Sequence, residues 1–271
     1  MDDWILSHAN ALRVSVFLGV IIAFSALEAA FPRRQRGQKR LARWVTNAGM
    51  LVLATALVRI IALAAPVLAG VAAAGFAAER GWGLFHLIGF DGWGTALAGM
   101  LMLDFAIWFQ HWATHHVPLL WRLHRIHHGD GDIDATTALR FHPIEIALST
   151  LFKVAIILAL GLPVLAVLLF EILLNACAIF NHANLALPGW LDRALRPVLV
   201  TPDMHRVHHS VHRDEHDTNF GFCLSVWDRL FRTYTREPRG GHDGMQIGLT
   251  PIQPDRASRL GDSLLGPFTW P

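Results

Sequence analysis

The sequence predicts an all-α protein, a polytopic bundle of membrane helices with about three spans followed by a helical hairpin at residues 146–180. Apolar residues make up 53% of the 271 residues and charged residues only 16%, compared with about 25% in soluble domains. The mean hydropathy is positive, at +0.38. The apolar residues gather in long runs, and basic or histidine-rich segments separate these runs, as expected for a membrane bundle with a polar cap.

The first apolar run, residues 14–31, has the length of about 17–25 residues that a bilayer crossing requires. The residues before it are acidic where a secretory signal is basic, so we interpret the run as a retained span. Basic residues favour the cytoplasmic side of a membrane, which predicts a cytoplasmic loop after this span and an N-terminus outside. The basic residues of this loop are Arg33, Arg34, Arg36, Lys39, Arg40 and Arg43.

A second apolar region extends from about residue 45 to residue 78. As one helix rising about 1.5 Å per residue it would reach roughly 50 Å, which exceeds a single crossing. We therefore expect a kink near Pro66 and Gly70. The segment 79–83 has one basic residue and suits an external loop, after which a third span is predicted from about residue 84 to residue 109.

Residues 146–180 form another apolar stretch, which Gly161 and Pro163 interrupt near its middle. Histidines precede and follow the stretch, and a site shared by both sets requires an even number of crossings between them. We therefore expect a helical hairpin that either spans the bilayer twice or enters it and returns. Lys153 and Glu171 lie at similar distances from the tip, where they could pair with each other or lie separately near the interface.

Cysteine content and net charge exclude several classes of protein. Two cysteines, Cys177 and Cys223, are too few for a disulfide framework or a thiolate metal site. The net charge of +2 gives no indication of a nucleic-acid partner.

Histidine is the most informative residue type, with sixteen copies in the chain. Side chains three and four residues apart lie on one face of a helix with Cβ atoms about 5–6 Å apart, so we expect each His-x-x-His-His motif to present three imidazoles to one metal ion. The clusters are His111 and His115; His124, His127 and His128; and His205, His208 and His209.

The number and type of these ligands predict two metal ions. Seven or more imidazoles exceed the four ligands of one structural zinc site. Imidazoles suit iron, zinc, copper or nickel, and the absence of thiolates argues against an iron–sulfur cluster. Asp104 falls on the helical face of His111 and His115, so we expect its carboxylate to accept the free N–H of a ligand imidazole.

Other polar residues have less definite expected roles. Glu145 and Asp203 are further candidates for the role expected of Asp104. His116, His212 and His216 are expected at the surface or beside the ligands, because a metal ion has few coordination positions.

The histidine clusters lie in longer motifs that resemble the fatty acid hydroxylase superfamily, specifically its sterol desaturase branch. The resemblance covers about residues 100–235 and departs from the family pattern at Arg232, where the family usually has Gly. The motifs are Leu119–His128, Thr137–Glu145, Asn181–Asn184, Thr201–Ser210, Asn219–Gly221 and Trp227–Phe231.

The resemblance implies a di-iron centre that activates O2 to hydroxylate or desaturate a lipid, with zinc as an alternative occupant. It also implies an external electron donor, either cytochrome b5-like or a ferredoxin with its reductase. His142 and His182 match histidines of the family pattern and are predicted as additional ligands or as neighbours of the ligands. The full predicted set of metal ligands is His111, His115, His124, His127, His128, His142, His182, His205, His208 and His209.

The sequence therefore predicts an integral membrane oxidoreductase with its metal site facing the cytoplasm. The division is membrane-spanning helices at 1–110, a catalytic region at 100–235 that includes the hairpin, and a C-terminal tail at 236–271. The lipid could be a sterol, a hopanoid, a fatty acyl chain or a carotenoid. The alternative is a membrane metal transporter or sensor that binds ions transiently through its histidines.

Overall fold

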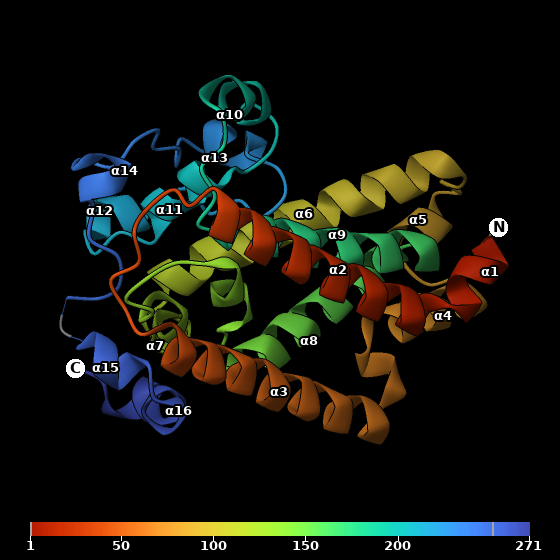
Figure 1. Ribbon diagram of the computed structural model, residues 1–271. Helices are drawn as coiled ribbons and strands as arrows, with labels where there is room; N and C mark the ends of the chain where they lie inside the picture. Colours follow the sequence, from red (N-terminus) through yellow and green to blue (C-terminus); the bar gives the residue numbers. More distant parts are fainter. Residues whose placement is uncertain (1, 251) are drawn as a thin grey trace.

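Long helices form one end of the molecule and short helices surround the other end, where the C-terminus lies (Figure 1). The computed structural model describes residues 2–250 and 252–271, which form no β-strand. The long helices are α2 (Ala9–Ala30), α3 (Arg40–Ala64), α6 (Trp93–His116), α8 (Pro143–Leu160) and α9 (Val164–His182). The shorter helices are α1 (Asp2–Ser7), α4 (Gly70–Arg80), α5 (Leu84–Leu87), α7 (Pro118–His128), α10 (Gly189–Leu195), α11 (Pro202–His208), α12 (Arg213–His216), α13 (Val226–Leu230), α14 (Gly241–Gly244), α15 (Pro254–Ala257) and α16 (Leu260–Thr269), with 3₁₀ turns at Pro66–Leu68 and Ala135–Leu139.

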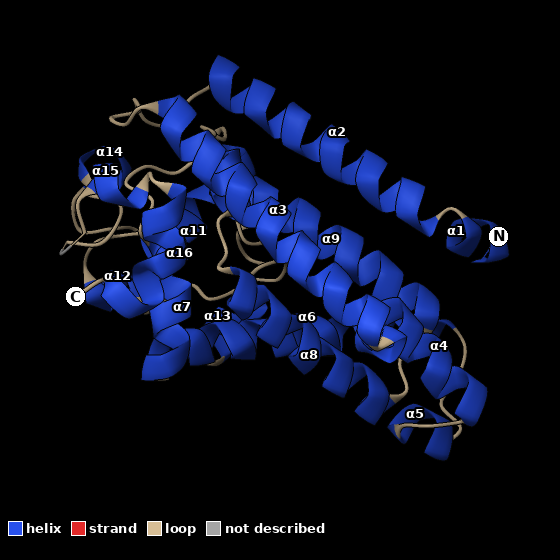
Figure 2. Ribbon diagram, turned by 90° about the horizontal axis from the view of Figure 1, so that it is seen from below, coloured by secondary structure: helices blue, strands red, loops and turns tan. Residues whose placement is uncertain are grey.

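Four long helices, α2, α3, α8 and α9, are sufficiently long and apolar to cross a membrane. They confirm the predicted bundle, in which α2 runs along the edge and packs against α9 (Figure 2). Both arms of the predicted hairpin are among the four.

The predicted third span differs from the structure. Residues 84–87 form the separate short helix α5, and α6 begins only at Trp93. α6 is not among the helices that qualify as spans, because Asp104, Gln110 and His111 place polar groups in its second half. It nevertheless runs from the far end of the bundle to the short-helix end, where it delivers the first histidines (Figure 1).

The second apolar region divides at Pro66, as predicted. α3 ends at Ala64, and a 3₁₀ turn separates it from α4. Proline has no backbone N–H and its ring blocks the preceding helical turn, so one continuous helix cannot form here. α4 then packs against α8 and α9 instead of extending the span.

At two glycines, the tip of the hairpin packs closely against the predicted external loop. Gly161 ends α8 with a left-handed backbone, at φ +70°. Gly83 lies so close to it that a Cβ atom on Gly83 would be 2.1 Å from the backbone nitrogen of Gly161. A side chain at Gly83 would therefore push the loop away from the hairpin.

Of the two arrangements that the sequence leaves open for Lys153 and Glu171, the ion pair between them does not form. Glu171 on α9 forms its ion pair with Arg13 on α2. Its other carboxylate oxygen lies beside Gly70, where a Cβ atom would be only 2.7 Å away. Glu171 therefore links α9 to α2 and α4, whereas Lys153 faces a cavity that is described below.

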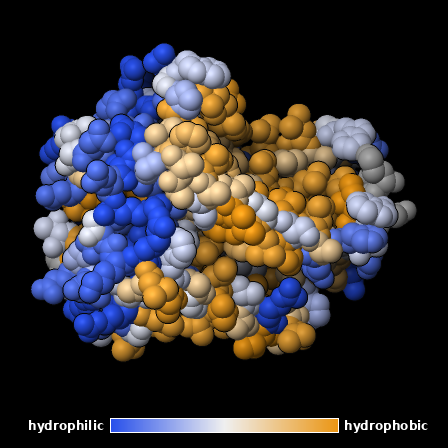
Figure 3. Space-filling view, in the orientation of Figure 1, coloured by the Kyte–Doolittle hydropathy of each residue, from blue (hydrophilic) through white to orange (hydrophobic). Residues whose placement is uncertain are grey.

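Polar residues gather at the short-helix end of the molecule and apolar residues cover the long helices (Figure 3). Arg43, which the sequence places among the residues of a basic loop, is instead completely buried at this end. Its guanidinium donates to Asp130 Oδ2 at 2.9 Å and to Asp134 Oδ2 at 2.8 Å. Because Asp130 follows α7 closely in sequence, this network fixes the end of α7 against α3.

The C-terminal tail also packs against α7 and α3. Arg125 on α7 donates to the backbone carbonyls of Gly266, Trp270 and Pro271. Buried Arg140 donates to Ile126 O at 2.9 Å and to Ser263 Oγ at 2.9 Å, and so joins the end of α7 to the tail. α7 is thereby held by α3 on one side and by α16 on another.

We expect Arg43→Met to destabilise the protein by about 3–5 kcal/mol, because it leaves two buried carboxylates without their cation. Thermal unfolding of the purified protein in detergent measures this loss. Arg236→Met is the matched control, because the Arg236 side chain is 72% exposed, and exposed pairs contribute about 0–1 kcal/mol. Equal unfolding temperatures for the two variants would contradict a structural role for the Arg43 network.

Candidate metal centre

Nine buried histidines meet between the ends of the long helices and the short helices. They form two groups, in each of which one nitrogen per ring lies within 4.8 Å of the others. The five-histidine group consists of His111, His115, His124, His128 and His208, and the four-histidine group of His127, His182, His205 and His209. α6, α7, α9 and α11 supply eight of these residues, and His209 follows α11 directly.

Each His-x-x-His-His motif contributes to both groups, which differs from the prediction that one motif serves one ion. On α7, His124 and His128 belong to the five-histidine group and His127 to the other. Residues four apart on a helix differ by about 40° around its axis, whereas adjacent residues differ by about 100°. His127 and His128 therefore point to different sites. On α11 the order is reversed, because the pair four apart, His205 and His209, joins the four-histidine group.

The nitrogens converge at distances that suit a metal ion. His111 Nε2 lies 3.1 Å from His124 Nε2 in the five-histidine group. In the four-histidine group, His182 Nε2 lies 3.0 Å from the Nε2 atoms of both His127 and His205. Ligands at about 2.1 Å from an ion are at most about 4.2 Å apart, so these pairs can share one. The two groups adjoin each other, since the rings of His128 and His209 stack with centroids 4.7 Å apart.

Backbone carbonyls hold the outer nitrogens of three of these rings. Nδ1 of His111 lies 2.7 Å from Phe220 O, and Nδ1 of His208 lies 2.7 Å from Thr218 O. His182 Nδ1 lies 2.6 Å from Ala178 O. A carbonyl can only accept a hydrogen bond, so each Nδ1 donates and Nε2 is left with its lone pair toward the centre.

Carboxylates hold two further rings in the same way. Glu145 Oε1 lies 2.6 Å from His124 Nδ1. Asp217 Oδ1 lies 3.2 Å from His115 Nδ1. Glu145 therefore has the role that the sequence analysis considered for it as well as for Asp104, which is to accept the N–H of a ligand imidazole.

Four of the nine rings have an inner nitrogen without a hydrogen-bond partner among the described residues. His115 Nε2 and His208 Nε2 are buried without a hydrogen bond, and so are both ring nitrogens of His128 and His209. An unsatisfied buried polar atom costs about 1–3 kcal/mol, so a cluster of them requires a compensating ligand. Burial and the neighbouring imidazoles lower the pKa of His128 and His208 well below the usual value. These two rings are therefore neutral, which is the form that binds metal, and an all-imidazole donor set suits iron, zinc, copper or nickel.

Asp104 does not contact a histidine. Its Oδ2 accepts hydrogen bonds from Trp227 Nε1 at 2.8 Å and from Leu224 N at 3.3 Å. Asp104 therefore anchors the segment that follows the last histidine cluster. Leu224 and Trp227 occupy Oδ2 of Asp104, and the predicted hydrogen bond to a ligand imidazole does not form.

Asp228 is a positioning residue that the sequence analysis missed. Its carboxylate accepts from Trp108 Nε1 at 3.0 Å and from the backbone nitrogens of Phe220 and Gly221 at 2.9 Å. Phe220 is the residue whose carbonyl holds His111. Asp228 lies in the motif Trp227–Phe231, which the sequence analysis noted. Its role depends on a contact with Trp108, which is 120 residues away in the chain, and local sequence patterns do not predict such a contact.

The other predicted residues lie outside both groups. His142 caps the start of α8, with Ile144 N donating to its Nδ1 at 3.2 Å, and its Nε2 lies 3.2 Å from Leu264 O. Asp203 forms an ion pair with Arg206 rather than holding a ligand ring. His116 and His212 are exposed, whereas His216 is buried and forms a third small group with His115 and Asp217.

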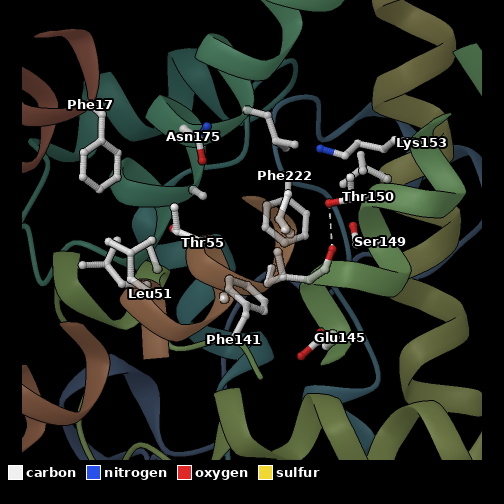
Figure 4. A pocket seen from close by; sticks show the side chains of 18 of the residues that line it. Phe17, Leu51, Thr55, Phe141, Glu145, Ser149, Thr150, Lys153, Asn175 and Phe222 are labelled. Atoms are coloured by element: carbon white, nitrogen blue, oxygen red, sulfur yellow. Dashed lines mark hydrogen bonds between the residues drawn. The ribbon is translucent and has the colours of Figure 1, made fainter. Parts of the chain in front are cut away.

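A cavity of ≈ 580 Å³ extends from the five-histidine group into the bundle. His111, His124 and Glu145 line it at the metal end. The remainder is lined by residues of α2, α3, α6, α8 and α9, the segment 138–141 and Phe222. In Figure 4, Glu145 lies at one side of the cavity and Lys153 and Asn175 at the other. The geometry thus connects a candidate metal centre with space between apolar helices.

Comparison with known proteins identifies relatives over the same region. Residues 96–233 match the family model for fatty acid hydroxylase. The chain is 32% identical to an ornithine lipid hydroxylase of Rhizobium tropici over 168 residues, which cover 59% of this chain and 48% of that protein. It is 31% identical to the alkylglycerol monooxygenase of Homo sapiens over 159 residues, which cover 57% of this chain and 33% of that protein. A very-long-chain aldehyde decarbonylase of Oryza sativa subsp. indica is 28% identical over 156 residues, which cover 52% of this chain and 24% of that protein.

This chain thus spans less than half the length of each of these three relatives. No solved structure matches it. The family match includes α6, α7, α9 and α11, which carry the ligand-forming histidines, and it covers half of the chain. The chain belongs to the fatty acid hydroxylase family.

Proposed function

We propose that this integral membrane protein is an O2-dependent, di-iron oxidoreductase that hydroxylates or desaturates a lipid. The observation that carries the proposal is the pair of adjoining, buried histidine groups, of which the five-histidine group opens onto a cavity between apolar helices. When bound, two iron ions would supply the reduction of O2 and the removal of hydrogen from an unactivated carbon, which no side chain can perform.

The protein's own contribution is to hold the ligands and to exclude water. The nine histidines are the proposed ligands, with five around one ion and four around the other. Phe141 stacks on His127 with ring centroids 4.2 Å apart, and Phe222 lies 4.9 Å from His111. Both aromatic rings also line the cavity, so an alkyl chain in it would meet an apolar wall next to the imidazoles.

The relatives support a lipid as the substrate. Two of them are named for lipid substrates, ornithine lipid and alkylglycerol. A lipid could enter the cavity from the bilayer, because its walls come from helices that can span a membrane.

We also propose a cytoplasmic metal centre and an N-terminus outside. The basic residues at 33–39 lie between α2 and α3, on the side of the bundle where the histidines gather. Electrons would then come from a cytoplasmic redox protein, either cytochrome b5-like or a ferredoxin with its reductase.

Replacing one ligand in each group tests the two-ion proposal. We expect His127→Ala and His208→Ala each to lower the iron content from about two ions to about one per chain, because each removes a ligand from a different group. Both variants should lose lipid oxidation. Elemental analysis of the purified protein and lipid profiling of expressing cells measure the two effects.

His116→Ala is the matched control, because His116 is exposed and lies outside both groups. Two ions in both ligand variants would refute the assignment of ligands. Rapid exchange of zinc by the unmodified protein, without change in any lipid, would favour a transporter or sensor.

Glu145→Gln tests the carboxylate that holds His124. We expect metal affinity or lipid oxidation to fall about 10–100-fold, because an amide accepts the imidazole N–H without the charge that strengthens it. A chelator titration compares the variant with Glu79→Gln, which changes an exposed carboxylate on α4. Unchanged metal retention and activity in Glu145→Gln would show that this hydrogen bond has no functional effect.

A further inference from the structure

Three cations line the cavity away from its histidines: Arg13 on α2, Arg59 on α3 and Lys153 on α8. Lys153 follows Glu145 by eight residues, which corresponds to about 12 Å along a helix. Figure 4 shows the Lys153 side chain reaching into the cavity, on the side away from Glu145. The cavity therefore has a metal end and a cationic end.

Only one of the three cations has an acidic partner. Arg13 pairs with Glu171, whose second oxygen is packed beside Gly70. Among the residues that the structure describes, neither Arg59 nor Lys153 forms an ion pair. Glu145, the acidic residue that lines the cavity, is committed to His124 at the other end.

An unpaired cation within an apolar helix is unfavourable. Lys153 is half-buried near the middle of α8, whereas Arg59 is exposed and lies near the end of α3. Snorkelling to the membrane interface can lower this penalty for a single side chain. It does not explain why cations from α3 and α8 line the same cavity as the polar groups Thr55, Thr150 and Asn175. The Thr150 hydroxyl donates to Ile146 O and one amide N–H of Asn175 donates to Glu171 O. The two cations, the Thr55 hydroxyl and the second amide N–H of Asn175 can provide charge and hydrogen bonds for an anion.

We propose that Arg59 and Lys153 bind the acidic group, a carboxylate or a phosphate, of the lipid substrate. This inference rests on the proposed lipid oxidation and adds the charge class of the substrate. The cationic end attracts the acidic group and holds it at a distance from the histidines. The substrate is thereby oriented with its hydrocarbon chain toward His111 and His124.

Lipid binding to the purified, iron-loaded protein in a neutral detergent tests this inference. The probes are two pairs, oleic acid with oleyl alcohol and lysophosphatidic acid with monoolein, which separate a carboxylate from a phosphate as the recognised group. We expect at least one acidic lipid to bind about tenfold more tightly than its neutral counterpart. Lys153→Met and Arg59→Met should each reduce this ratio several-fold, and the double variant should bring it close to one.

Arg80→Met is the control, because Arg80 is an exposed cation on α4 that does not line the cavity. Lys153→Arg keeps the charge and should retain the preference for the acidic lipid. Iron content equal to that of the unmodified protein shows that a variant has folded. Equal binding of acidic and neutral lipids by the unmodified protein, or an unchanged ratio in the double variant, would overturn the inference.

Failure of this inference can be distinguished from failure of the proposed function. Oxidation of a neutral lipid by a protein without acidic preference would overturn the cationic site and leave the di-iron activity in place. A clear acidic preference without oxidation of any lipid would support the cationic site and contradict the proposed activity.

Discussion

The structure depends on one constraint, which is that nine imidazoles are buried together and four of them, among the described residues, have an inner nitrogen without a hydrogen-bond partner. Such an arrangement is unfavourable unless the rings are oriented from outside and share a ligand inside. The outer partners provide the orientation. Glu145, Asp217 and three backbone carbonyls hold five of the nine rings by Nδ1, and so direct Nε2 inward.

Those outer partners are themselves held by buried polar contacts between residues that are far apart in the sequence. Asp228 holds Phe220, whose carbonyl orients His111, against Trp108 on α6. Arg43 fixes the segment after α7 to α3, and Arg140 joins α7 to the C-terminal tail. The tail, which the sequence division sets apart from the catalytic region, therefore packs directly on a helix that carries three of the ligands. The four helices must be held in fixed positions relative to one another, because no single helix supplies more than three of the nine rings.

Local patterns explain what the sequence could predict. Apolar run length identified the four helices that can cross a membrane, although it also predicted a third span at 84–109 that the structure divides into α5 and α6. Histidine spacing identified eight of the nine clustered rings, because it is a property of adjacent helical turns. Partner choice depends on tertiary packing and could not be predicted: Glu171 pairs with Arg13 instead of Lys153, and Asp104 with Trp227 instead of an imidazole. Arg232 is instructive, because it has φ +60° at the position where the resembled family usually has glycine. The departure in sequence thus leaves the left-handed backbone in place.

The two histidine groups are not equivalent with respect to the cavity. Among the described residues, the histidines that line it are His111 and His124, both of the five-histidine group. The four-histidine group lies behind Phe141, which stacks on His127 and forms part of the cavity wall. Any molecule in the cavity therefore meets the five-histidine group first. Glu145 lines the cavity and also holds His124, so this carboxylate can contact both the bound molecule and a metal-binding histidine. This asymmetry follows from the division of each His-x-x-His-His motif between the groups, since a single turn of α7 faces the cavity with His124 and the second group with His127.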